Sequence, residues 1–157
     1  TYGPRQSQRA IIPTLITQFL KGDGYVKVGS TSPTRDFNHV VDTCAGFVAA
    51  AEADADKCVG QTFNLGSNFE ISIAQLIETV AEITGLDVDI QTENQRLRPA
   101  GSEVERLFAD ASKAKDILNW SARFGGHDGF RKGLASTIEW FRQPENLASY
   151  KIGRYSV

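Results

Sequence analysis

The stretch ISIAQLIETVAEITG, residues 71–85, carries the clearest helix signal in the sequence. Ser72 and Gln75 have the spacing of a capping box, in which each side chain accepts a hydrogen bond from the other residue's backbone N–H. Apolar residues then recur on one helical face, and Gly85 stands where helices commonly stop. We therefore predict an amphipathic helix between Ser72 and Gly85.

Helices and strands alternate upstream of this helix. The apolar and turn residues predict, in order, a loop at residues 2–6, a helix with Pro13 in its first turn and Gly22 after its end, strands at 25–28 and 35–41, a helix capped by Asp42 that runs to about residue 55, and a buried strand at 62–65.

Downstream, the pattern predicts a half-buried strand at 87–91 and a charged loop at 95–105. Two helices follow, the first capped by Asp110 and the second by Asp128. The second presents an inward face made of Phe130, Leu134, Ile138 and Phe141. This order predicts one α/β domain of mixed helices and short strands that begins mid-fold.

Composition narrows the function classes. Hydrophobic residues make up 41% and charged residues 23% of the 157 residues, and the formal net charge is −2. No basic cluster is present for nucleic acid, and no apolar run is long enough for a membrane span. Cys44 and Cys58 lack the spacing of a metal or redox motif, so we expect reduced thiols and a cytoplasmic protein.

Arg35 is the first candidate binding residue. It follows a Pro-Thr turn and begins an aromatic-rich strand, and its planar guanidinium group suits the paired oxygens of a diphosphate. The alternative is a structural salt bridge to Asp36 or Asp42.

Two further segments are candidates for an anion site. In the loop after the 87–91 strand, Arg98 can pair with phosphate and Glu103 can accept hydrogen bonds from sugar hydroxyls, although an ordinary solvated loop would look the same. The opening loop leads into a helix start, whose backbone N–H groups attract anions; its alternative is a plain turn.

Metal and dinucleotide sites are not indicated by the sequence. His39 and His127 lack zinc-ligand spacing, so we expect no metal. The glycine-rich residues 125–129 precede a helix but follow no strand, which predicts a turn. No catalytic residue is assigned.

Several segments together resemble the C-terminal half of the extended short-chain dehydrogenase/reductases that act on nucleotide sugars, specifically the 4,6-dehydratases of legionaminic-acid-type pathways. The resemblance spans essentially the whole chain. Its carriers are Tyr2-Gly3-Pro4-Arg5-Gln6-Ser7, Ile12-Pro13, Ser32-Pro33-Thr34-Arg35-Asp36-Phe37, Asn64-Leu65-Gly66-Ser67, Arg96-Leu97-Arg98-Pro99, Ser102-Glu103-Val104-Glu105-Arg106-Leu107 and Ser112-Lys113-Ala114-Lys115.

The resemblance implies a role for each candidate. Arg35 and Arg98 would hold the diphosphate, Glu103 would bind the ribose, the backbone of Ala10 and Ile11 would touch phosphate, and Val26 and Val28 would frame the base. The implied ligand is a UDP- or GDP-linked sugar.

The sequence departs from the family in one important respect. Such enzymes also need a glycine-rich strand-turn-helix for NAD and a Tyr-x-x-x-Lys pair for proton and hydride transfer, and neither occurs here. We therefore expect residues 1–157 to be the substrate-binding region of a larger NAD-dependent enzyme, inactive alone. The alternative hypothesis is a stand-alone interaction module that self-associates into a homo-oligomer through the surface left by the missing half.

Overall fold

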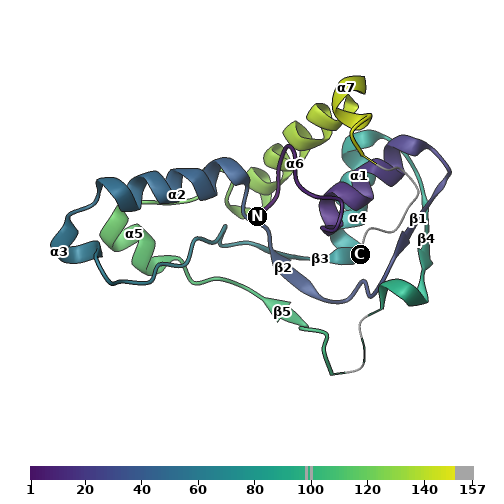
Figure 1. Ribbon diagram of the computed structural model, residues 1–157. Helices are drawn as coiled ribbons and strands as arrows, with labels where there is room; N and C mark the ends of the chain where they lie inside the picture. Colours follow the sequence, from purple (N-terminus) through teal and green to yellow (C-terminus); the bar gives the residue numbers. More distant parts are fainter. Residues whose placement is uncertain (98, 100, 151–157) are drawn as a thin grey trace.

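The computed structural model describes residues 1–97, 99 and 101–150. In chain order its elements are α1 (Ile11–Lys21), β1 (Tyr25–Val28), β2 (Thr34–Asp36), α2 (Val40–Glu52), α3 (Ala55–Cys58), β3 (Glu70–Ser72), α4 (Ile73–Thr84), β4 (Asp89–Thr92), the 3-10 helix η1 (Asn94–Arg96), β5 (Arg106–Leu107), α5 (Ser112–Leu118), α6 (Gly126–Arg142) and α7 (Pro144–Leu147). The chain is α/β, as predicted. Figure 1 shows a body that contains α1, α4 and α6, and an arm that contains α2, α3 and α5.

The body is held by a core in which α1, α4 and α6 pack on one another and α1 also packs on β1. The predicted inward face of α6 is confirmed, because Phe130, Leu134, Ile138 and Phe141 are almost completely buried. Burial of each such side chain stabilises the fold by roughly 1.5–3 kcal/mol.

Helix α4 begins and ends as the sequence predicts. The Ser72 hydroxyl accepts a hydrogen bond from the Gln75 N–H at 3.1 Å, and the Gln75 side chain accepts one from the Ser72 N–H at 3.0 Å. Gly85 closes the helix in the left-handed conformation. These local contacts fix α4 relative to β3, which precedes it directly.

Two small sheets connect the helices. Strand β1 pairs in parallel with β4, and β2 lies between antiparallel β3 and parallel β5. The side chain of Gln18 on α1 acts as an additional partner for β1, since it accepts a hydrogen bond from the Lys27 N–H at 2.7 Å and donates one to the Lys27 carbonyl at 3.2 Å.

The strand expected at 87–91 occurs as β4, but it is not half-buried, because all four of its residues are exposed. Helix α1 covers β1, and no helix of the described residues packs extensively on β4.

The strand predicted at 35–41 is shorter than expected. Strand β2 ends at Asp36, and α2 already begins at Val40. The intervening backbone pairs with the first residues of the chain, since the Tyr2 N–H donates to the Asn38 carbonyl at 2.9 Å and the Val40 N–H donates to the Tyr2 carbonyl at 2.7 Å. This pairing turns the chain away from the sheet.

Asp42 is not the N-cap of α2, so that prediction is wrong. The N-cap is His39, whose Nδ1 accepts a hydrogen bond from the Val41 N–H at 3.3 Å. The Asp42 carboxylate is buried in the first turn of the helix and accepts hydrogen bonds from the N–H groups of Arg123 and Phe124 at 3.0 and 2.9 Å. Asp42 therefore ties the arm to the start of α6.

Two other local predictions need correction. Asp128 does not cap α6, which begins two residues earlier after Gly125. Asp110 accepts a hydrogen bond from the Ser112 N–H at 2.9 Å, but α5 takes Ala111 as its formal N-cap.

The buried strand predicted at 62–65 is not formed, because no strand of the described residues offers these four residues a ladder partner. None of the described helices is long and apolar enough to cross a membrane.

Candidate functional site

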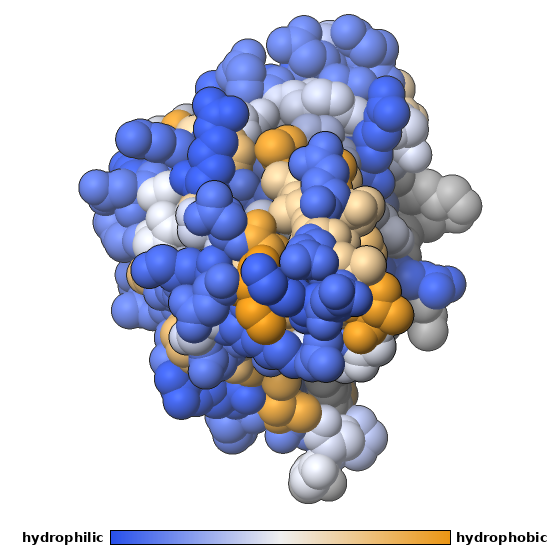
Figure 2. Space-filling view, turned by 90° about the vertical axis from the view of Figure 1, so that its left-hand side faces the viewer, coloured by the Kyte–Doolittle hydropathy of each residue, from blue (hydrophilic) through white to orange (hydrophobic). Residues whose placement is uncertain are grey.

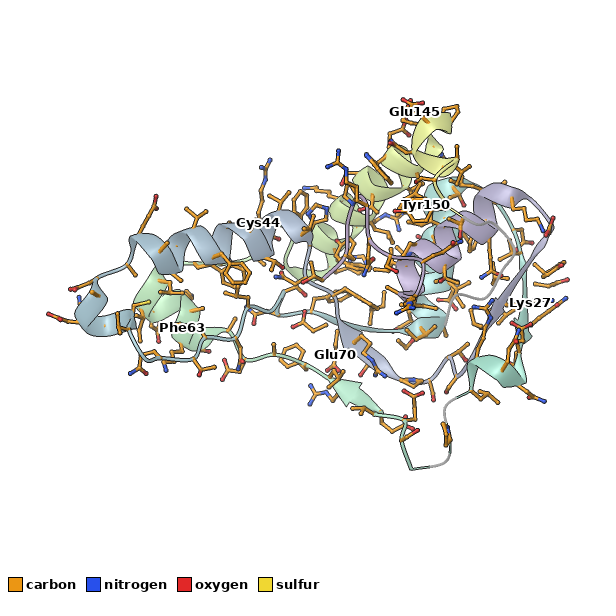
Figure 3. The ribbon with its side chains drawn as sticks, viewed as in Figure 1. Lys27, Cys44, Phe63, Glu70, Glu145 and Tyr150 are labelled. Carbon is orange, nitrogen blue, oxygen red and sulfur yellow. The ribbon has the colours of Figure 1, made fainter. Side chains whose placement is uncertain are left out.

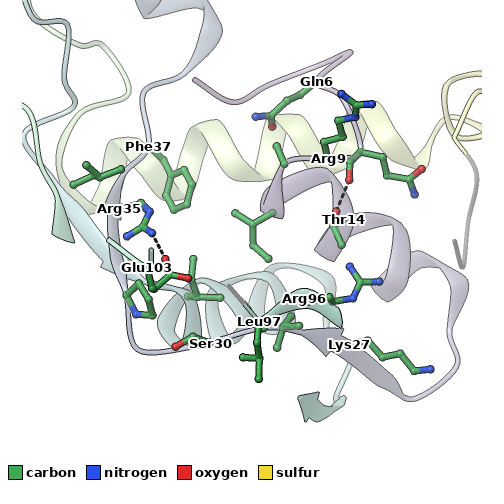
Figure 4. A pocket seen from close by; sticks show the side chains of 18 of the residues that line it. Gln6, Arg9, Thr14, Lys27, Ser30, Arg35, Phe37, Arg96, Leu97 and Glu103 are labelled. Atoms are coloured by element: carbon green, nitrogen blue, oxygen red, sulfur yellow. Dashed lines mark hydrogen bonds and ion pairs between the residues drawn. The ribbon is translucent and has the colours of Figure 1, made fainter. Parts of the chain in front are cut away.

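A pocket of about 590 Å³ opens between the start of α1, the end of β1, strand β2 and the segment that follows η1 (Figure 4). Its described lining includes the cationic residues Arg9, Lys27, Arg35 and Arg96. The acidic lining residues are Asp36 and Glu103. The pocket thus has an excess of positive charge in a molecule whose net charge is −2, which favours an anionic ligand.

The start of α1 forms one wall of the pocket. Its N-cap, Ala10, offers no side-chain hydrogen bond, and its first turn holds no acidic residue. Pro13 has no N–H, so the orphan donors of this turn are the N–H groups of Ile11 and Ile12, for which the described residues provide no acceptor. Such an uncapped start presents donors and positive dipole to an anion.

Arg35 and Glu103 meet on the opposite wall. Arg35 Nη2 donates to Glu103 Oε1 at 2.9 Å, and Nη1 donates to the Thr34 carbonyl at 2.8 Å. The side chains are only 18% and 25% exposed, so solvent screens the pair less than a surface pair. The guanidinium group is thereby fixed in orientation at the edge of the pocket.

The alternative partners considered for Arg35 are engaged elsewhere. Asp36 Oδ1 accepts hydrogen bonds from the Ser67 N–H at 2.9 Å and the Ser67 hydroxyl at 2.6 Å. Asp42 is bonded to the backbone before α6. Asp36 and Asp42 therefore have structural roles, and the Arg35 side chain instead pairs with a residue that is 68 positions away.

The remaining sequence candidates divide into three groups. Ala10, Ile11 and Val28 line the pocket. Val26 is fully buried in the core of the body and is not among the lining residues. Arg98 lies outside the described residues.

A second cluster of charges was missed by the sequence reasoning. Glu93 accepts a hydrogen bond from Arg96 Nε at 2.5 Å, and Lys27 Nζ lies 3.9 Å from its other oxygen. Arg96 beside it holds the pKa of the Glu93 carboxyl below its usual range. The i,i+3 spacing of Glu93 and Arg96 could have predicted this ion pair from the sequence.

Gly29 fixes the distance between this cluster and β1. A Cβ at this position would overlap the Arg96 carbonyl oxygen, so only glycine allows η1 to approach so closely. The close approach holds the Arg96 backbone against the end of β1 at the pocket wall.

The glycine-rich segment 125–129 does not form a dinucleotide-binding turn. Gly125 and Gly129 are needed for packing, because a Cβ there would overlap the Ser67 carbonyl oxygen and the Phe124 backbone respectively. The segment enters α6 from a turn and not from a strand. Within the described part of the chain, no three His, Cys, Asp or Glu side chains gather as metal ligands.

Comparison with known proteins identifies the family. The model of the GDP-mannose 4,6-dehydratase family matches residues 1–133. The chain belongs to this family. The expected relationship to NAD-dependent nucleotide-sugar dehydratases and epimerases of the extended short-chain dehydrogenase/reductase type is thereby confirmed, while the legionaminic-acid branch stays a prediction.

Curated relatives match most of this chain but less than half of their own length. A UDP-N-acetyl-α-D-glucosaminuronate decarboxylase from Bacillus cytotoxicus is 29% identical over 92% of this chain and 44% of the relative. A dTDP-glucose 4,6-dehydratase from Xanthomonas campestris is 31% identical over 89% of this chain and 40% of the relative.

Solved structures show the same partial match. One match is UDP-glucuronic acid 4-epimerase from Bacillus cereus, solved in complex with UDP-glucuronic acid and NAD, with a TM-score of 0.77 and 29% sequence identity. The match covers 90% of this chain and 42% of the epimerase chain. Another is dTDP-glucose 4,6-dehydratase from Bacillus anthracis, solved in complex with NAD, with a TM-score of 0.74 and 25% sequence identity. The match covers 92% of this chain and 42% of the dehydratase chain.

Proposed function

We propose that residues 1–157 bind a UDP- or GDP-linked sugar and constitute the substrate-binding region of an NAD-dependent nucleotide-sugar dehydratase or epimerase. The observation that carries the proposal is the pocket in which the Arg35–Glu103 pair faces the uncapped start of α1. Relatives solved with UDP-glucuronic acid support the ligand class.

The diphosphate is the part of the ligand that best matches the positive groups. Arg35 keeps its orientation through Thr34 and Glu103, so it loses little side-chain entropy when it donates its remaining N–H groups to phosphate oxygens. The N–H groups of Ile11 and Ile12 supply the second set of donors. Arg98 is proposed, from the sequence alone, as the second guanidinium group.

The nucleoside is assigned to the Glu103 end of the pocket. A carboxylate accepts hydrogen bonds from both hydroxyls of a ribose, and Glu103 would share its oxygens between Arg35 and this diol. Val28 at the end of β1 offers an apolar contact for the base. Val26 is left out of the proposal because it is not among the residues that line the pocket.

The pocket supplies binding and orientation, and no proton or hydride acceptor is assigned to it. In the relatives NAD supplies the redox chemistry when bound. The glycine-rich segment 125–129 does not form the turn that binds a dinucleotide, and the sequence holds no Tyr-x-x-x-Lys pair. We therefore propose that residues 1–157 alone bind the nucleotide sugar without converting it.

Isothermal titration calorimetry tests the proposal. We expect UDP-glucuronic acid or GDP-mannose to bind with at least high-micromolar affinity, and inorganic phosphate to bind far more weakly. Arg35→Ala should abolish measurable binding, whereas Arg142→Ala, which removes an exposed arginine from the end of α6, should not. Absence of heat with every nucleotide sugar at millimolar concentration would refute the proposal.

A further inference from the structure

The ion pair of Glu70 and Arg106 differs from other surface pairs in the number of strands that it spans. Figure 2 looks at the end of the arm, where polar side chains cover most of the surface. On α3, at that end, Lys57 pairs with Asp54, which is three positions away. Glu70 and Arg106 are 36 positions apart and lie on β3 and β5, the two strands that flank β2. This pair therefore reaches across a whole sheet.

Arg106 and Glu70 are joined by two hydrogen bonds that run side by side. Nε of Arg106 donates to Glu70 Oε2 at 2.8 Å, and Nη2 donates to Oε1 at 2.6 Å. Thr34 on the central strand β2 donates its hydroxyl to Glu70 Oε2 at 2.9 Å. Arg106 holds the pKa of the Glu70 carboxyl below its usual range, and Thr34 adds to this shift. Glu70 is labelled beside these strands in Figure 3. We call Thr34, Glu70 and Arg106 the clasp.

The clasp lies on the face of the sheet that is turned away from the pocket. Side chains alternate between the two faces along a strand, and in the register Thr34 pairs with Arg106 while Arg35 pairs with Leu107. Arg35 and Leu107 line the pocket, whereas none of the clasp residues is among the described lining residues. A ligand in the pocket therefore meets this sheet through Arg35 and Leu107 and does not touch the clasp.

Strand β5 has few other contacts that fix its position. It consists of two exposed residues, and β2 is its only partner among the described strands. The Thr34 N–H also donates to the Glu105 carbonyl at 2.8 Å, directly before β5. Segments with so few buried contacts open locally at low cost. Glu103 lies three residues before Arg106, so a displacement of β5 also displaces the carboxylate that orients Arg35.

We propose that the clasp positions Glu103 for nucleotide-sugar binding. Glu70 and Thr34 hold Arg106, Arg106 holds β5 against β2, and β5 holds Glu103 beside Arg35. The inference rests on the proposed function, because it concerns the same pocket. The clasp residues are positioning residues, since they act on the ligand through Glu103. Exposed ion pairs contribute little to global stability, so we expect the clasp to change ligand affinity more than the free energy of unfolding.

Calorimetry with UDP-glucuronic acid and Glu70→Gln separates the clasp from a general charge effect. The variant makes the protein more positive, so general attraction predicts tighter binding of an anion. Loss of the clasp predicts the opposite, an affinity at least about 3-fold weaker. Arg106→Gln should weaken binding similarly. Unchanged or tighter binding by Glu70→Gln would overturn the inference.

Two further variants control this comparison. The charge-reversed double variant Glu70→Arg/Arg106→Glu has the net charge of the wild type and can form the pair again, so its affinity should return to within about 2-fold of the wild type. Arg131→Gln on α6 removes an exposed arginine that pairs with Glu82, and it should bind as the wild type does. A circular dichroism melt of each variant checks that the fold is retained.

A double-mutant cycle tests whether the clasp acts through Glu103. Once Glu103→Ala has removed the carboxylate, its position no longer matters, so the added change Arg106→Gln should weaken binding by less than about 2-fold. Independent effects that multiply would overturn the role of Glu103 and would indicate a general loss of structure around the pocket.

Amide hydrogen exchange at Thr34, measured without ligand, tests the clasp separately from the proposed function. Glu70→Gln and Arg106→Gln should both speed exchange of the Thr34 N–H, while the Val40 N–H, which donates to the Tyr2 carbonyl, should exchange as in the wild type. Unchanged exchange at Thr34 would overturn the clasp whether or not a nucleotide sugar binds. Faster exchange at Thr34, together with a wild type that binds no nucleotide sugar, would support the clasp and refute the proposed function.

Discussion

Glu103 Oε1 accepts a hydrogen bond from Arg35 Nη2 at 2.9 Å, although 68 positions separate the two residues in the sequence. The pair places a carboxylate and a guanidinium group on the same wall of the pocket. Each side chain can thus contact a different part of one ligand, and each holds the other side chain in its orientation.

Glu103→Gln should change the affinity for two ligands in opposite directions. The variant weakens a charge-assisted hydrogen bond to the ribose, so we expect affinity for a nucleotide sugar to fall by roughly 1.5–3 kcal/mol. Inorganic pyrophosphate has no ribose and is repelled by the carboxylate, so its affinity should rise. Calorimetry with both ligands measures the difference; parallel changes would contradict the assigned roles.

Arg98→Ala should weaken nucleotide-sugar binding by roughly 2–5 kcal/mol if this arginine is a desolvated phosphate clamp, as the sequence predicts. The slope of affinity against salt concentration should also become shallower, because one phosphate contact is lost. Arg131→Ala on α6, which pairs with Glu82, serves as a control that removes the same charge elsewhere. Equal effects of the two variants would argue against a clamp.

Gln18→Ala should destabilise the fold by about 1–3 kcal/mol, because it leaves the N–H and carbonyl groups of Lys27 without their side-chain partner. Urea denaturation followed by circular dichroism measures the loss. Gln91→Ala on exposed β4 is the matched control and should change the free energy of unfolding by less than about 0.5 kcal/mol. A loss of unfolding free energy as small as that of the control would show that the hydrogen bonds of Gln18 to Lys27 do not stabilise β1.

The free energy of unfolding should fall as the pH drops below about 6.5, the ordinary pKa of histidine. Burial lowers the pKa of His39 in the folded state, and Asp42 opposes the shift only partly. The unfolded chain therefore binds more protons between the lowered pKa and 6.5, and the stability present above this window is lost within it, by up to about 1.4 kcal/mol per pH unit.

Variants at the two histidines isolate this effect. Protonation of Nδ1 would also break the cap that His39 gives Val41. His39→Asn keeps a capping side chain and should flatten the pH dependence in this window, whereas His127→Gln, at an exposed position, should leave it intact. Stability that is flat between pH 7 and 5.5 in the wild type would contradict a buried neutral His39.

Local signals in the sequence predicted local structure well. The capping box of Ser72 and Gln75, the stop at Gly85 and the inward face of α6 depend on residues within one helix, and all three are confirmed. Asp42 failed as an N-cap because its carboxylate bonds to backbone N–H groups 81 and 82 positions away. The local sequence pattern that predicts an N-cap does not reveal such long-range hydrogen bonds.

The sequence likewise indicated individual residues of the candidate site but not how they are arranged. The sequence indicated Arg35 and Glu103 separately, but only the packing of β2 beside the loop before β5 brings them together. Val26 and Val28 share the buried face of β1, yet only Val28 at the strand end lines the pocket. The strand predicted at 62–65 has suitable residues but no ladder partner among the described residues, because strand formation depends on a neighbour that local composition cannot supply.

Backbone amide NMR during titration with UDP-glucuronic acid tests the central claim most directly. Shifts should concentrate at Ala10, Ile11, Gly29, Arg35 and Glu103, which line the pocket, and the amides of α5 in the arm should stay unchanged. Saturable shifts confined to the arm, or no saturable shifts at millimolar ligand, would contradict a nucleotide-sugar site between α1 and β2.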